Sequence, residues 1–108
     1  MGQGTARNSI TTTGVTYTTI SLTSSNTFTF SNSHNILKVN NSSTSSVYLY
    51  STPSRDQMFI VKSRHNSVIY PITIFGNGKL IDGLSSFTIN VQNASYNFLY
   101  DGNEYIII

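Results

Sequence analysis

The chain has 108 residues, of which only 9% are charged, and its six basic and four acidic side chains leave a net charge of +2. This length fits one domain. The basic residues are too scattered for nucleic-acid binding, and no apolar run approaches the roughly 20 residues of a membrane span. The absence of cysteine excludes disulfides, thiolate metal sites and a cysteine nucleophile. We therefore expect one domain with neither nucleic acid nor membrane as a partner.

Residues 1–15 are polar and rich in Gly, Ser and Thr, without alternation of apolar and polar positions. Such a segment is typical of a terminal arm that becomes ordered only against a partner. We predict a flexible arm over 1–15, with Arg7, Asn8 and Ile10 as candidates for anchoring it to a larger particle. The folded domain is predicted over 16–108.

Short runs of β-forming residues follow one another closely from Tyr17 onward. They are "YTTISL" at 17–22, "TFTF" at 27–30, "ILKV" at 36–39, "VYLYS" at 47–51, "MFIVK" at 58–62, "VIYPITIF" at 68–75, "FTINV" at 87–91, "YNFLY" at 96–100 and "EYIII" at 104–108. Pro71 lacks a backbone N–H, so we expect one strand before it and one after it. The abundant Ser, Thr and Asn disfavour helices. This pattern predicts an all-β fold, a single small antiparallel sandwich or barrel of jelly-roll-like type.

Two of these runs, 58–61 and 105–108, are apolar on both faces. A strand of this kind is normally covered on both faces. In a single small sandwich, however, each sheet has one outer face in water. Either these strands are central to an unusual packing, or their second face contacts another subunit; a third reading leaves Ile106 and Ile108 merely exposed near the terminus. We expect a homotrimer. The candidate interface residues are Phe59, Val61, Tyr105, Ile106, Ile107 and Ile108.

The stretch "FGNGKLIDG", Phe75 to Gly83, combines three glycines with a lysine and an aspartate. A phosphate-binding loop would continue into a helix, but this chain returns at once to a strand. A hard cation needs about six oxygen ligands, and this stretch contains only one carboxylate, that of Asp82, which argues against an ion site here. We predict two turns, in which "GNG" and "DG" provide residues with positive φ.

Catalytic and metal-binding patterns are absent. Asp82 and Asp101 lie in "DG" pairs typical of turns, while Asp56, Glu104, His34 and His65 form no recognisable motif. We predict no enzyme activity, no cofactor and no metal. The seven tyrosines are interpreted mainly as residues of the core and interface, with stacking on sugar rings as the alternative.

The stretch from Ile36 to Ile108 resembles a small β-module of bacteriophage tail fibres, tailspikes and capsid-surface proteins. The family pattern has a "V-x-L-P" strand, then "G-Q-x-[FY]-x-I-K-D", "I-T-I", "I-D-G" and a closing "D-G-x-x-W-x-I". Here "VYLYSTP" at 47–53, "DQMFIVKS" at 56–63, "ITIFGNGKLIDG" at 72–83 and "FLYDGNEYIII" at 98–108 follow in the same order. Asp56 replaces the Gly of the pattern, Ser63 the Asp and Tyr105 the Trp.

The resemblance implies a trimeric virion component with β-rich subunits side by side, and it implies no activity by itself. We expect a capsid decoration or cement protein that docks on the virion surface, next to the major capsid protein or another virion protein, after assembly in the host cytoplasm. Its polar arm and single β-module favour this role. The alternative is a tail-fibre or tailspike module that binds host cell-surface glycan, as the many tyrosines would allow.

Overall fold

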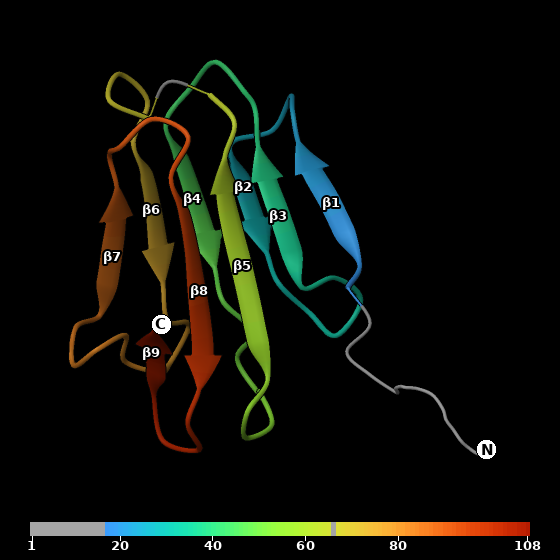
Figure 1. Ribbon diagram of the computed structural model, residues 1–108, viewed down its shortest axis with the longest axis vertical. Helices are drawn as coiled ribbons and strands as arrows, with labels where there is room; N and C mark the ends of the chain where they lie inside the picture. The colour runs from blue at the N-terminus through green and yellow to red at the C-terminus, as the bar shows by residue number, and fades with distance from the viewer. Residues whose placement is uncertain (1–16, 66) are drawn as a thin grey trace.

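The computed structural model describes residues 17–65 and 67–108, which form nine strands and no helix (Figure 1). The strands are β1 (Thr19–Leu22), β2 (Thr27–Thr29), β3 (Ile36–Val39), β4 (Ser45–Tyr48), β5 (Met58–Ser63), β6 (Ile72–Phe75), β7 (Ser86–Ile89), β8 (Ser95–Tyr100) and β9 (Tyr105–Ile107). The predicted all-β class is therefore confirmed. Within the described part of the chain, there is no helix with the length and apolar character needed to cross a membrane.

The strands form two mixed sheets. One has five strands in the order β1-β3-β5-β8-β9, and the other has four in the order β2-β4-β6-β7. The pairs β1–β3, β3–β5, β2–β4 and β4–β6 are parallel, whereas β5–β8, β8–β9 and β6–β7 are antiparallel. The prediction of an antiparallel sandwich is thus wrong for the four pairs formed among the first six strands. A jelly roll is built from antiparallel strands, so the observed strand order is not of that type.

The parallel pairs arise because the first six strands alternate between the two sheets: β1, β3 and β5 belong to one sheet, and β2, β4 and β6 belong to the other. A parallel pair needs a long crossover between its members, and here the crossover from β1 to β3 contains β2. The pairs β1 with β2, β3 with β4 and β5 with β6 therefore form three successive rungs of a short stack. In the register, Thr19 lies beside Ile36, and Ile36 lies beside Ile60. The antiparallel strands β7, β8 and β9 complete the two sheets beyond the third rung (Figure 1).

One hydrophobic core lies between the inner faces of the two sheets. Alternation along each strand decides which side chains enter it; in β5, for example, Phe59 and Val61 are buried while Met58 and Ile60 are half-buried. The buried apolar residues are Leu22, Phe30, Leu37, Val39, Val47, Leu49, Phe59, Val61, Ile72, Ile74, Ile81, Ile89, Phe98, Tyr100 and Tyr105.

Only one of the two strands expected around Pro71 is present. Strand β6 begins at Ile72, whereas residues 67–70 form a turn in which Val68 and Ile69 are exposed. Buried polar groups hold this turn, because the Ser63 hydroxyl donates to the carbonyl of His65 at 3.1 Å and Nε2 of His65 lies 2.8 Å from the carbonyl oxygen of Tyr70. These local hydrogen bonds compete with strand pairing.

Candidate functional site

A mainly apolar stripe crosses the outer face of the five-stranded sheet. One cross-strand row consists of Met58, Leu99 and Ile106. The next row contains Ile36, Ile60 and Asn97, and Ile108 continues it because its backbone N–H donates to the carbonyl of Asn97 at 3.1 Å. Ile108 is exposed, and the other members are half-buried. We call the seven residues Ile36, Met58, Ile60, Asn97, Leu99, Ile106 and Ile108 the outer stripe.

The six candidate interface residues separate into two groups. Phe59, Val61 and Tyr105 are at most 1% exposed within the chain itself, so they have no surface to offer another subunit, and their assignment to the interface is corrected. The strands β5 and β9 are apolar on both faces, and these three side chains lie on the inner face, which packs in the core. Ile107 also packs against the core, whereas Ile106 and Ile108 belong to the outer stripe.

The glycine-rich stretch forms turns, as predicted. Asn77 and Gly78 have φ values of 55° and 97°, and Asp82 and Gly83 have values of 47° and 81°. The backbone N–H of Gly83 donates to the carboxylate of Glu104 at 2.7 Å. Its amide is thereby satisfied within the chain, and the glycines serve backbone geometry.

The ionisable side chains are dispersed. Over residues 17–65 and 67–108, no group of three His, Asp or Glu side chains could hold a metal ion. The Asp101 carboxylate accepts the backbone N–H groups of Asn103 and Glu104, both at 2.8 Å, and these hydrogen bonds lower its pKa. It therefore stabilises the turn between β8 and β9. His65 is buried, with one ring nitrogen bonded to a backbone carbonyl.

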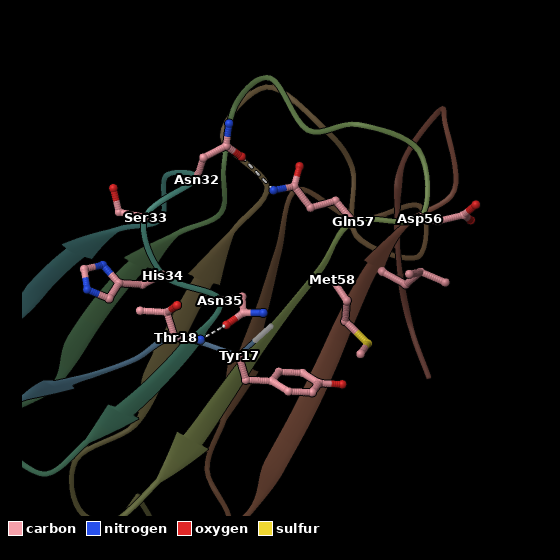
Figure 2. Close-up of a pocket in the computed structure, with 10 residues that line it drawn as sticks. Tyr17, Thr18, Asn32, Ser33, His34, Asn35, Asp56, Gln57 and Met58 are labelled. Atoms are coloured by element: carbon pink, nitrogen blue, oxygen red, sulfur yellow. Dashed lines mark hydrogen bonds between the residues drawn. The ribbon is translucent and has the colours of Figure 1, made fainter. Parts of the chain in front are cut away.

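A pocket of about 330 Å³ opens at the end of the five-stranded sheet where β1, β3 and β5 begin and β8 ends. Figure 1 shows these strand ends, and Figure 2 shows the side chains that line the pocket. In Figure 2, the ring of Tyr17 runs along one side with its hydroxyl towards Met58, and the side chains of Asn32 and Gln57 meet on the opposite side. The imidazole of His34 and the carboxylate of Asp56 point away from the middle. The lining residues are Tyr17, Thr18, Asn32, Ser33, His34, Asn35, Asp56, Gln57, Met58 and Leu99.

Hydrogen bonds fix the polar side of this pocket. Nε2 of Gln57 donates to Oδ1 of Asn32 at 2.8 Å, and Oε1 of Gln57 accepts the backbone N–H of Ser54 at 3.0 Å. Oδ1 of Asn35 accepts the backbone N–H of Thr18 at 2.7 Å. The amides are therefore held in place by segments that lie far apart in the sequence.

Sequence reasoning identified the individual residue types but missed this pocket. Its walls come from the segment before β1, the connection between β2 and β3, the connection between β4 and β5, and the end of β8. Only the general expectation that a tyrosine could stack on a sugar pointed towards it. The candidate anchoring residues Arg7, Asn8 and Ile10 lie outside the described residues.

Comparison of the sequence with protein-family models and with curated proteins gives no match.

Proposed function

We propose that this chain is a non-enzymatic structural protein of a bacteriophage virion, a decoration or cement protein that docks on the capsid surface as a homotrimer. The observation that carries the proposal is the outer stripe, an apolar surface on the outer side of the five-stranded sheet. A monomer that leaves such a surface in water is unusual when the surface is contiguous. The order of motifs from Ile36 to Ile108 supports the virion context.

A second copy of this chain suits the stripe because none of the side chains of the stripe is charged. Identical stripes pack against one another without burying an unpaired charged side chain, which would be costly. The adjacent cross-strand row contains Lys38 and Lys62, and at the rim of such an interface their charges stay in water and are screened by salt. Apolar cores with charged rims are the usual anatomy of subunit interfaces.

Light scattering on the full-length protein at micromolar concentration tests the assembly, with a trimer mass as the expected result. Location is tested by antibody labelling of particles that contain the protein, with labels on the capsid surface expected and a copy number that is a multiple of three. A well-folded monomer at every concentration, or a protein absent from purified particles, would contradict the proposal.

The alternative function is that of a tail-fibre or tailspike module that binds host glycan. The observation that favours it is the pocket beside Tyr17, where an exposed aromatic ring lies on the opposite side from hydrogen-bonded amide groups. Labels at the tail instead of the capsid would select this alternative.

A further inference from the structure

We propose that the pocket at the start of β1, β3 and β5 binds a neutral sugar of one or two rings. The inference deepens the glycan-binding alternative by naming the residues and the class of sugar, and it does not depend on a trimer. Tyr17 is the first element of the site because its side chain is 52% exposed. An exposed aromatic ring of this kind offers a flat apolar face to the C–H groups of a pyranose, while its hydroxyl remains available for hydrogen bonding.

The amides opposite Tyr17 supply the polar half of the site. A primary amide has two N–H donors and an oxygen with two acceptor positions. The hydrogen bonds of Asn32 and Gln57 use only part of this capacity. The NH₂ group of Asn32 donates to Oη of Tyr50 at 3.4 Å, and that of Gln57 donates to Oδ1 of Asn32 at 2.8 Å. The remaining donors and acceptors match sugar hydroxyls, which both donate and accept. Because the amides are already held in position, little side-chain entropy is lost on binding.

The size and floor of the pocket fit a small amphipathic ligand. Its volume of about 330 Å³ lies at the lower end of the range for small-molecule sites. Met58 and Leu99 contribute apolar surface at the end of the outer stripe. A sugar ring has the required combination of an apolar C–H face and a polar rim, whereas a wholly apolar ligand would leave the amide groups without partners.

Charge selects neutral sugars over acidic ones. No lysine or arginine lines the pocket, and the Asp56 carboxylate stands at its edge with no hydrogen bond or ion pair to other described residues through its side chain. A uronic or sialic acid would bring a second carboxylate to a pocket that offers no cation to pair with it, and the exposed carboxylate of Asp56 at the rim adds repulsion between like charges. The site therefore favours hexoses and N-acetylhexosamines.

The test is titration of ¹⁵N-labelled full-length protein with methyl glucoside, methyl galactoside, N-acetylglucosamine and glucuronic acid, followed by NMR. At least one neutral sugar is expected to shift the side-chain amide signals of Asn32 and Gln57. Tyr17→Ala should weaken this binding at least tenfold. Tyr48→Ala is the matched control, because Tyr48 lies on the four-stranded sheet outside the lining of this pocket, and it should bind as the wild type does.

Asp56→Asn tests the charge argument. Asp56 has a φ of 69°, a conformation that Asn also tolerates, so the backbone should be kept. The ratio of glucuronic acid affinity to neutral sugar affinity is expected to rise at least threefold in this variant. If no neutral sugar shifts the pocket amides, or if Tyr17→Ala binds like the wild type, the sugar site is wrong. If glucuronic acid binds the wild type as well as neutral sugars do, only the selectivity is wrong; a monomer in light scattering would instead contradict the proposed trimer.

Discussion

Ile106 and Ile107 leave β9 on opposite faces of the five-stranded sheet. Ile107 pairs with Phe98 and packs against the core, whereas Ile106 pairs with Leu99 in the outer stripe. The sequence predicts that neighbouring residues of this strand face different environments, and the structure shows that Ile107 faces the core and Ile106 the outer surface. The two side chains are chemically identical and adjacent in sequence, so they form a matched pair for separating folding from association.

We predict that Ile107→Asp destabilises the fold by at least about 2 kcal/mol, because it removes apolar packing and brings a charge to the edge of the core. The carboxylate of Asp82 lies 3.4 Å from the backbone nitrogen of Ile107, so the new charge also meets a like charge. Ile106→Asp should instead keep the fold and weaken association.

Thermal unfolding at several protein concentrations distinguishes these effects, because assembly coupled to folding makes the midpoint depend on concentration. Ile107→Asp should lower the midpoint at every concentration. Ile106→Asp should remove the concentration dependence. Wild-type midpoints for Ile106→Asp at all concentrations would mean that the outer stripe contacts no other copy.

Tyr105 gives a prediction for alkaline pH. Its ring is buried, its hydroxyl donates to the carbonyl of Tyr50 at 2.7 Å, and burial raises its pKa above the ordinary value of 10.0. Above pH 10, the unfolded chain releases this proton while the folded chain keeps it, so the folded state binds more protons and the free energy of unfolding falls as pH rises. The full contribution of Tyr105 to the free energy of unfolding is therefore present below pH 10 and is lost progressively as the pH rises above 10.

Tyr105→Phe should remove this part of the pH dependence. Loss of the hydrogen bond should also lower the free energy of unfolding by roughly 0.5–1.5 kcal/mol at neutral pH. Urea unfolding of both proteins between pH 8 and 11 provides the measurement. Parallel curves for variant and wild type would show that the buried hydroxyl is not responsible for alkaline destabilisation.

Gly76 is predicted to be intolerant of any side chain. A Cβ at this position would overlap the carbonyl oxygen of Lys79, which belongs to the backbone and cannot simply rotate away. Gly76→Ala should therefore cost about 1–3 kcal/mol through overpacking. Gly78→Asn is the control, since its surroundings are open and Asn accepts positive φ. Chemical denaturation that finds Gly76→Ala as stable as this control would contradict the turn geometry.

Deletion of residues 1–15 is predicted to leave the domain folded and to abolish attachment to the particle. The buried apolar cluster of the described residues extends from Leu22 to Tyr105, and a polar segment contributes little to such a core. Circular dichroism measures the fold, and co-sedimentation with particles measures attachment. An unfolded truncated protein would show that the segment is structural, and unchanged co-sedimentation would show that it is no anchor.

The sequence by itself determined the all-β class, most strand positions and the turns. The run "ILKV" coincides with β3, and the positive φ values at Gly78 and Gly83 lie where the glycine pairs predict them. These features depend on local sterics and on alternation, which are written into a few consecutive residues. Val91 is an exception, since it continues the alternation of β7 but is 52% exposed beyond the end of that strand.

Only the tertiary structure decided which strands pair, which isoleucine enters the core and which side chains share the pocket. Strand pairing depends on partners distant in the sequence, and alternation leaves open which face is inner and whether a neighbour is parallel. The pocket is still less local, because Tyr17, Asn32 and Gln57 come from three separate segments. Residues 17 and 57 line the same pocket only because β1, β3 and β5 start at the same end of one parallel stack, and no single segment encodes that alignment.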